Sequence, residues 1–171
     1  MILPFVRDLF LGLEQSHPFH ALLAAVAPER GRARTGGLTE TARALYMALL
    51  AHAAGRSVLV LAADNRAVES LLDLLRTFHE YASPAAPPPV LLPAHDLLPG
   101  DGLSPHPDIS EKRAIALWKM ARGQAGIVVA PLAAAAMRLE PPAFYANLAL
   151  TVRRGDSLQT EMLATHLQSV G

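Results

Sequence analysis

Short apolar runs alternate along the chain with longer segments in which apolar residues recur every three or four positions. Leu38 to Ala53 predicts a helix with one apolar stripe, and Gly55 follows as its C-terminal cap. The run Ser57 to Ala62 has the length and continuous apolar character of a buried strand. Asp64 is placed to cap a second helix, whose apolar face consists of Val68, Leu71, Leu72, Leu75 and Phe78. These segments therefore predict a β-α unit.

The same alternation continues through the rest of the sequence, where we predict three more strands, at Val90 to Leu92, Gly126 to Ala130 and Leu148 to Val152. Alternating strands and helices are typical of parallel sheets with crossover helices. The pattern therefore predicts a layered α/β fold. We expect a mostly parallel sheet of about five strands with helices on both faces.

Two helix starts in the second half of the chain are predicted from polar residues. Asp108 and Glu111 have the spacing of a capping box, which would open a helix running to about Arg122. Ser157 is placed to cap the last helix. An amphipathic helix close to the end of the sequence usually packs against a further element, so we expect the chain to be a fragment of a longer protein.

The octapeptide Gly37-Leu38-Thr39-Glu40-Thr41-Ala42-Arg43-Ala44 has the position of a phosphate-binding loop of the type G-x-x-x-x-G-K-[ST]. A working loop needs a second glycine, a lysine for the phosphates and a hydroxyl for magnesium. Here those places hold Ala42, Arg43 and Ala44, so the degenerate loop consists of Gly37, Thr41, Ala42, Arg43 and Ala44, and only Gly37 matches the motif. The sequence therefore predicts a nucleotide site that has lost its chemistry.

Composition narrows the class of protein. Hydrophobic residues make up 51% of the 171 residues, and the formal net charge is zero, which favours a globular chain without the large basic excess of an autonomous nucleic-acid binder. Arg30, Arg32 and Arg34 form a local basic cluster that we interpret as a solvated loop. The absence of cysteine, of a signal peptide and of a membrane-spanning run predicts a cytoplasmic protein.

Ionisable side chains concentrate in the stretch His95 to Asp108. Its histidines and aspartates are of the types that bind divalent metals, but no pair has helical i, i+4 spacing, so we predict an interaction loop and no metal site. Ser104 beside His106 lacks the context of a nucleophile, and we predict no catalytic residue. Candidate interaction residues are Ser104, His106, Asp108, Arg113, Arg153 and Arg154.

Four ordered segments carry a resemblance to a known family. They are GLTETARALYMALLAHAAGRSVLVLAADNRAVESLLDLL, LLPAHDLLPGDGLSPHPDISEKRAIALWKM, IVVAPLAAAAMRL and LALTVRRGDSL. Together they resemble the N-terminal part of bacterial transcription-repair coupling factors (Mfd), from about Gly37 to the end. The most specific element is Asp101 to Ile109, followed by Arg113.

The resemblance implies a UvrB-like domain of the P-loop NTPase and helicase type with a degenerate nucleotide site. UvrB carries an aromatic-rich β-hairpin that holds damaged DNA, whereas no aromatic residue lies between Val90 and Asp108 here. The match therefore favours the coupling factors over UvrB. It implies three parts: residues 1–35 as a helical extension and linker, residues 36–147 as the UvrB-like domain, and residues 148–171 as the start of a truncated UvrA-binding domain.

The family implies a function for the full-length protein. It would displace stalled RNA polymerase from damaged DNA by ATP-driven translocation and recruit UvrA for nucleotide excision repair. ATP and magnesium would bind only to a downstream motor. RNA polymerase and DNA would bind to downstream domains. This segment would contact UvrA and other domains of its own chain. The alternative is a functional ATPase or helicase-type domain in which Arg43 substitutes for the missing lysine.

Overall fold

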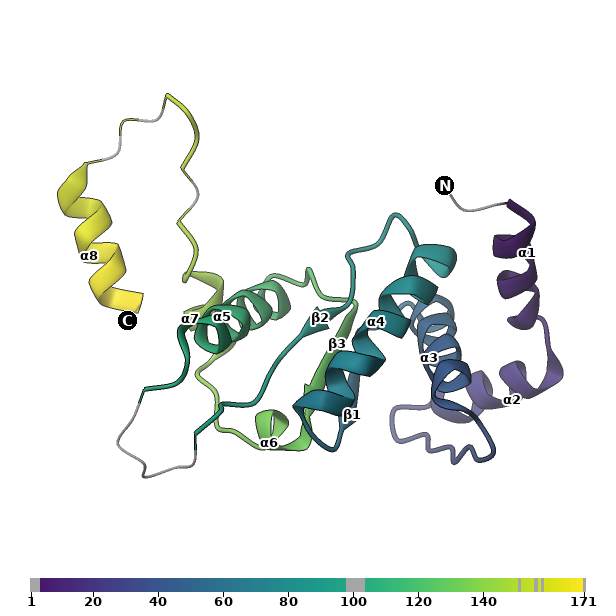
Figure 1. Cartoon of the computed structure of the whole chain (residues 1–171). Helices are drawn as coiled ribbons and strands as arrows, with labels where there is room; N and C mark the ends of the chain where they lie inside the picture. The colour runs from purple at the N-terminus through teal and green to yellow at the C-terminus, as the bar shows by residue number, and fades with distance from the viewer. Residues whose placement is uncertain (1–3, 98–103, 151, 156, 158, 171) are drawn as a thin grey trace.

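The computed structural model describes residues 4–97, 104–150, 152–155, 157 and 159–170 (Figure 1). Its sheet consists of the strands β1 (Val58–Ala62), β2 (Val90–Leu91) and β3 (Ile127–Pro131). All pairings are parallel and the order is β1-β3-β2, with Val60 opposite Val129 and Val90 opposite Val128. The mixed α/β fold with a parallel sheet is thus confirmed, although the described residues contain three strands and not about five.

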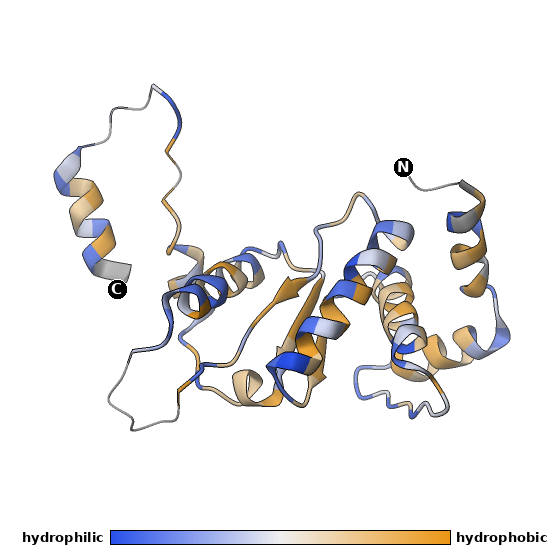
Figure 2. Ribbon diagram, viewed as in Figure 1, coloured by the Kyte–Doolittle hydropathy of each residue, from blue (hydrophilic) through white to orange (hydrophobic). Residues whose placement is uncertain are grey.

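Helices cover the two faces of this sheet. On one face lie α3 (Glu40–Ala54) and α4 (Asn65–Ala82), whose apolar residues pack with Val60, Ile127 and Val129. On the other face α5 (Pro107–Ala121) packs with Val90, Val128 and Ala130, next to α6 (Leu132–Ala135) and α7 (Pro142–Ala146). Figure 2 shows the strands as the most continuous apolar part of the chain. Every residue of β3 is buried, so the core lies on both sides of this central strand.

The N-terminal segment is helical and packs on the layer formed by α3 and α4. In α1 (Pro4–Leu13), the ring of Phe10 stacks on Tyr81 with centroids 5.0 Å apart and meets the edge of Phe78 at 5.5 Å. In α2 (His17–Val26), the buried Phe19 contacts Tyr46 of α3. Phe10 thus packs on the core cluster that includes the sheet, whereas Phe19 lies in a separate cluster with Leu49 and Ala82.

Several predicted helix ends are confirmed by their backbone geometry. Gly55 ends α3 with a left-handed φ of 58°, which a residue with a side chain rarely adopts. Asp64 caps α4 by accepting a hydrogen bond from the Ala67 N–H at 2.8 Å. The strands predicted from Ser57, Val90 and Gly126 all occur within about one residue of the expected bounds.

Three predictions were wrong. Helix α5 begins at Pro107 with His106 as N-cap, because proline suits the first helical turn, so Asp108 and Glu111 form no capping box. Helix α8 (Thr160–Val170) begins three residues beyond Ser157. The strand predicted from Leu148 to Val152 is absent from the described residues 148–150 and 152, where Leu150 and Val152 are exposed and have no neighbouring strand to pair with.

The described helices include none that is both long enough and apolar enough to cross a membrane. Helix α8 stands apart from the sheet in Figure 1, at the end of the segment that follows α7. Its residues Met162 and Leu167 are exposed.

Replacing Leu75 by alanine tests the core between α4 and the sheet. The side chain is fully buried, so Leu75→Ala should lower the free energy of unfolding by about 2–5 kcal/mol through reduced burial and a residual cavity. The matched control is Leu167→Ala on α8, where the leucine is 57% exposed and the change should stay within about 0.5 kcal/mol. Urea unfolding measures both; equal effects would contradict this description of the core.

Candidate functional site

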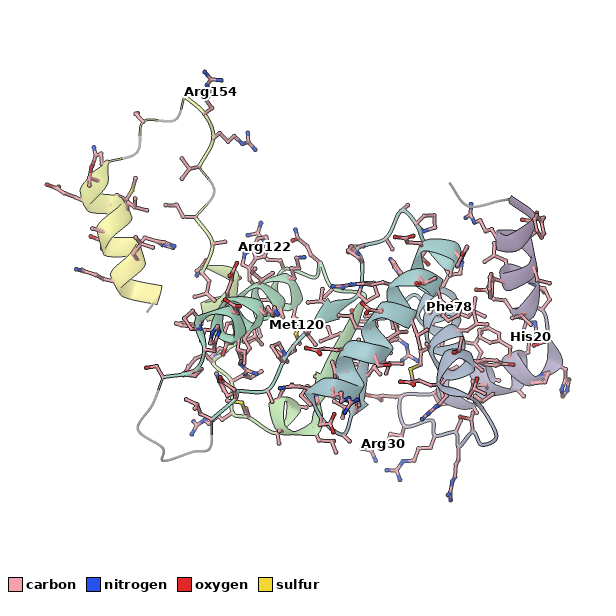
Figure 3. The ribbon with its side chains drawn as sticks, viewed as in Figure 1. His20, Arg30, Phe78, Met120, Arg122 and Arg154 are labelled. Atoms are coloured by element: carbon pink, nitrogen blue, oxygen red, sulfur yellow. The ribbon has the colours of Figure 1, made fainter. Side chains whose placement is uncertain are left out.

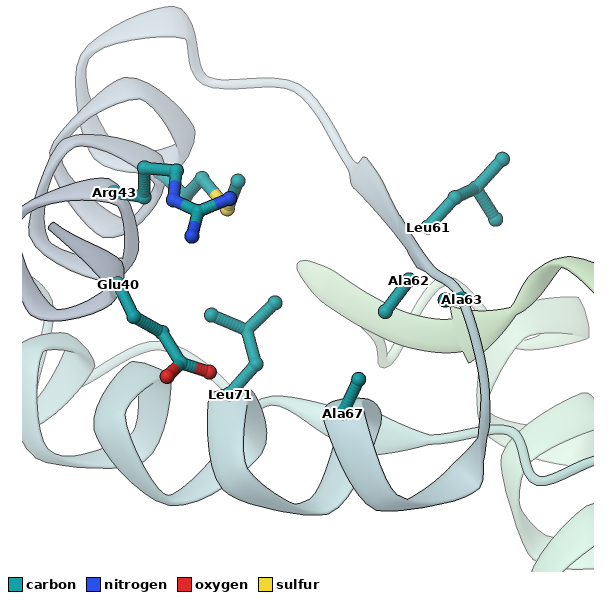
Figure 4. Close-up of a pocket in the computed structure, with 8 residues that line it drawn as sticks. Glu40, Arg43, Leu61, Ala62, Ala63, Ala67 and Leu71 are labelled. Atoms are coloured by element: carbon teal, nitrogen blue, oxygen red, sulfur yellow. The ribbon is translucent and has the colours of Figure 1, made fainter. Parts of the chain in front are cut away.

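A cavity of about 330 Å³ lies beside the octapeptide (Figure 4). The first turn of α3 supplies Glu40 and Arg43, and Met47 lies one turn further on. The end of β1 and the residue after it supply Leu61, Ala62 and Ala63, and α4 supplies Ala67 and Leu71. The cavity thus lies at the carboxyl end of a parallel strand and near two helix N-termini, where α/β proteins often bind phosphate groups.

The lining of this cavity is mostly apolar. Arg43 is its one cation, and the carboxylate of Glu40 comes from the same turn of α3. A carboxylate there opposes the binding of a phosphate, because like charges repel. No serine, threonine or lysine lines the cavity, so these residues offer no hydroxyl for a magnesium ion.

The backbone of the octapeptide also takes part in the hydrogen bonds that start α3. Gly37 has a left-handed φ of 73°, and the helix begins only at Glu40. The side chain of Thr39 caps α3 by accepting a hydrogen bond from the Ala42 N–H at 3.2 Å, and the Thr39 carbonyl accepts one from the Arg43 N–H at 2.9 Å. Residues 27–39, all described, contain no strand before the loop. A phosphate-binding loop normally follows such a strand.

The predicted site residues of the octapeptide differ from one another in their surroundings. Gly37 and Thr41 are exposed, Ala42 is half-buried, and Arg43 faces the cavity. Ala44 is fully buried in the cluster formed with α4 and the sheet, so its side chain faces the core. The acidic residue of the cavity, Glu40, was not predicted as a site residue, although it lies inside the octapeptide.

The second candidate region, His95 to Asp108, is tied together at its described ends. The His106 N–H donates to Asp96 Oδ1 at 3.3 Å, and the Asp108 N–H donates to His106 Nδ1 at 3.3 Å. Ser104 is exposed, whereas Asp101 lies outside the described residues. Among the side chains that the structure describes, no group of three histidines, aspartates or glutamates is arranged to hold a metal ion.

Arg113 contacts the segment just before the start of this region. Its side chain is 6% exposed and donates a hydrogen bond from Nη1 to the Pro93 carbonyl. Burial lowers the pKa of the guanidinium, and Tyr145 acts in the opposite direction. Arg113 therefore has a structural contact that its position in the sequence motif did not reveal.

His95 lies next to this buried arginine. Burial, and then the positive charge of Arg113, lower the pKa of His95 from its ordinary value of 6.5, while Asp96 raises it. The Nδ1 atom of His95 is buried and has no hydrogen-bond partner among the described residues. The neutral imidazole is therefore the favoured form in the folded protein at neutral pH.

Arg153 and Arg154 belong to neither of these two regions. They are exposed on the segment between α7 and α8, and Figure 3 shows Arg154 at the outermost turn of that segment. The structure thus brings together neither these arginines and the loop of His106, nor that loop and the octapeptide.

An apolar groove of about 420 Å³, formed by Ile115, Trp118 and Leu148 with neighbouring alanines, lies on the outer side of α5.

Comparison with known proteins gives a consistent family. The transcription-repair-coupling factor of Escherichia coli is 29% identical over 136 residues, which are 80% of this chain and 11% of that protein. The one of Haemophilus influenzae is 31% identical over 81 residues, 47% of the chain and 7% of that protein. The one of Bacillus subtilis is 21% identical over 159 residues, 93% of the chain and 13% of that protein. No family model and no solved structure matches the chain.

The fold defines the chain as an α/β module with a parallel sheet and a cavity at the carboxyl end of β1. It is similar, over most of its length, to a region of transcription-repair coupling factors, so the predicted resemblance is confirmed. The chain spans about a tenth of the length of these relatives.

The lowered pKa of His95 predicts a pH-dependent stability. The folded state binds a proton on His95 less tightly than the unfolded state, so its contribution to stability is complete above about pH 6.5 and is lost as pH falls through the folded-state pKa. Urea unfolding between about pH 8 and about pH 5 measures this loss. We expect a smaller loss in His95→Gln and an unchanged one in His20→Gln, an exposed control on α2. Identical profiles for the native chain and His95→Gln would contradict the assignment.

Proposed function

We propose that the chain is a non-catalytic, UvrB-like module of a transcription-repair coupling factor. The proposal combines the relationship to those proteins with the cavity beside Arg43. In the full-length protein, downstream domains would displace stalled RNA polymerase from damaged DNA by ATP-driven translocation. This module would contribute to the recruitment of UvrA and to contacts with those domains.

The observation that carries the non-catalytic assignment is the burial of Ala44. A hydroxyl at this place is the magnesium ligand of a working loop. The side chain at position 44 is fully buried in the core cluster and is a methyl group, so it supplies no ligand to the cavity. The Thr39 hydroxyl is nearby in sequence, but it already caps α3.

A second candidate function is an ATPase or helicase-type domain with an atypical loop, and one observation favours it. Arg43 lines a cavity at the carboxyl end of β1, and its guanidinium is suited to bind phosphate oxygens in pairs. Against it, the end of β3 is Ala130-Pro131 and carries no carboxylate to hold magnesium. The carboxylate of Glu40 also opposes an anionic ligand. The non-catalytic module therefore has the stronger support.

The recruitment role would involve residues 148–171, which we propose to be the start of a UvrA-binding domain. Arg153 and Arg154 are exposed on the part of this segment that projects from the sheet (Figures 1 and 3). Exposed arginines at such a place suit an acidic surface on a protein partner, because charged pairs at an interface fix register and speed association. The proposal assigns to these two residues a contact with UvrA.

Titration of the chain with magnesium and ATP tests the non-catalytic assignment. We expect isothermal calorimetry to show no saturable binding below about millimolar ATP, where the binding free energy is only about −4 kcal/mol. Arg43→Gln serves as the control, since it removes the one cation of the cavity. Micromolar affinity in the native chain that is abolished in Arg43→Gln would establish the ATPase-type alternative.

Binding to purified UvrA tests the recruitment role separately. We expect weak but saturable binding by biolayer interferometry, weakened about tenfold or more in Arg153→Glu/Arg154→Glu by charge repulsion. The matched control is Arg122→Glu/Arg138→Glu, which changes the net charge equally at other exposed sites. Absence of saturable binding, or equal weakening in both variants, would contradict the assignment of this contact.

A further inference from the structure

The loop that joins α2 to α3, residues 27–39, carries a cluster of exposed cations that the proposed recruitment of UvrA does not use. Every second residue from Arg30 to Arg34 is an arginine, and all three arginines are exposed. Among the residues that the structure describes, none of the three guanidinium groups forms a salt bridge. We call residues 28–34 the arginine loop. It presents three charges in a chain whose formal net charge is zero.

The entry into the arginine loop is held in place by specific contacts. Arg56 donates hydrogen bonds from one guanidinium nitrogen to the carbonyls of Val26 at 3.2 Å and Ala27 at 3.3 Å. The Gly31 N–H donates to the Pro28 carbonyl at 2.8 Å and closes a turn. A Cβ atom on Gly31 would clash with the Ala25 carbonyl oxygen, so only glycine fits this close approach. The loop therefore starts from a fixed base.

The arginine loop lies at the end of the molecule that also carries the cavity. Figure 1 shows it at the same end as the first turns of α3 and α4, and Figure 3 shows Arg30 below these helices. Helix N-termini carry partial positive charge, which adds to the attraction of anions. Among the described residues, the charged side chains of the loop, of its base and of the starts of α3 and α4 are six arginines and three carboxylates: Arg30, Arg32, Arg34, Arg43, Arg56 and Arg66, and Glu29, Glu40 and Asp64.

The carboxylates at this end reduce the excess of positive charge without cancelling it. Asp64 is engaged as the cap of α4, and Glu40 faces the cavity. Glu29 lies within the arginine loop, directly before Arg30, so it is the acidic residue nearest in sequence to the three arginines. The local net charge is therefore positive along the exposed edge formed by Arg30 to Arg34.

The spacing of the arginines selects the kind of anion. Arg30 lies in the turn that Gly31 closes, and Arg32 and Arg34 follow it in a segment without regular secondary structure. Three cations are therefore close together along the chain, which suits a ligand with repeated negative charges. Guanidinium groups bind phosphate oxygens in pairs. Residues 27–39 contain no aromatic side chain on which an unpaired base could stack. We propose that the arginine loop binds the phosphate backbone of nucleic acid without reading its bases.

Fluorescence anisotropy with a labelled DNA duplex of about 20 base pairs tests this proposal over a range of salt concentrations. We expect saturable binding at low salt. In Arg30→Gln/Arg32→Gln/Arg34→Gln the affinity should fall about tenfold or more, and the slope of log K against log salt should become shallower by up to about 2.7, which is about 0.9 for each phosphate that the variant no longer neutralises. Circular dichroism and urea unfolding of this variant verify that it folds.

The control variant removes the same charge elsewhere. Arg7→Gln/Arg122→Gln/Arg138→Gln changes three exposed arginines on α1, after α5 and after α6. Its affinity for the duplex should remain within about twofold of the native chain, because these residues lie outside the loop. Equal weakening in both variants would show attraction to total charge only and would overturn the proposal, as would absence of saturable binding to the duplex.

Two further probes identify the ligand. A single strand of the same sequence should bind no more tightly than the duplex, since the loop offers no stacking platform; tighter binding of the single strand would contradict a backbone-only contact. Polyglutamate of similar charge should displace the duplex poorly, and equal displacement would overturn the selectivity for phosphate. None of these measurements involves UvrA or ATP, so their outcome is independent of the recruitment role.

Discussion

The burial of β3 between two layers of helices is the constraint on which the rest of the structure depends. All five of its residues are buried, and alternate side chains face α3 and α4 on one side and α5 on the other. A strand buried on both faces must be apolar throughout, which leaves it no place for a catalytic side chain. Polar chemistry in this fold is therefore confined to strand ends, helix ends and loops.

The parallel order of the strands decides where such chemistry can be. The carboxyl end of β1 and the first turns of α3 and α4 meet at one edge and enclose the cavity of Glu40 and Arg43. The described lining residues of this cavity include one cation, Arg43, and no serine, threonine or lysine. In the proposed module this edge is a scaffold, and the proposed partner contact lies on the exposed segment with Arg154.

The local signals in the sequence predicted the sheet and its helices well. Continuous apolar runs identified β1, β2 and β3, and Asp64 and Gly55 identified helix ends, because each of these features depends on residues close in sequence. The strand predicted from Leu148 is absent from the described residues because strand formation depends on residues far apart in sequence. A strand needs a neighbouring edge, and an apolar run by itself does not show whether one is available.

The sequence patterns also did not predict which polar residues are buried. Arg113 was predicted as an interaction residue, and that role stays a prediction, but its contact with the Pro93 carbonyl depends on two segments 20 positions apart. The burial of Ala44 and the inclusion of Glu40 in the cavity likewise depend on how α3 rotates against α4. The degenerate phosphate-binding loop stays a prediction, and the packing shows where Arg43 and Ala44 of the octapeptide lie.

Hydrogen-deuterium exchange of the chain, alone and with either magnesium-ATP or UvrA, tests most directly whether this module recruits a partner and performs no nucleotide chemistry. The account predicts that magnesium-ATP leaves the exchange of residues 37–44 and 61–67 unchanged, and that UvrA slows exchange in residues 148–170. Protection of residues 37–44 by magnesium-ATP, with none of residues 148–170 by UvrA, would contradict it.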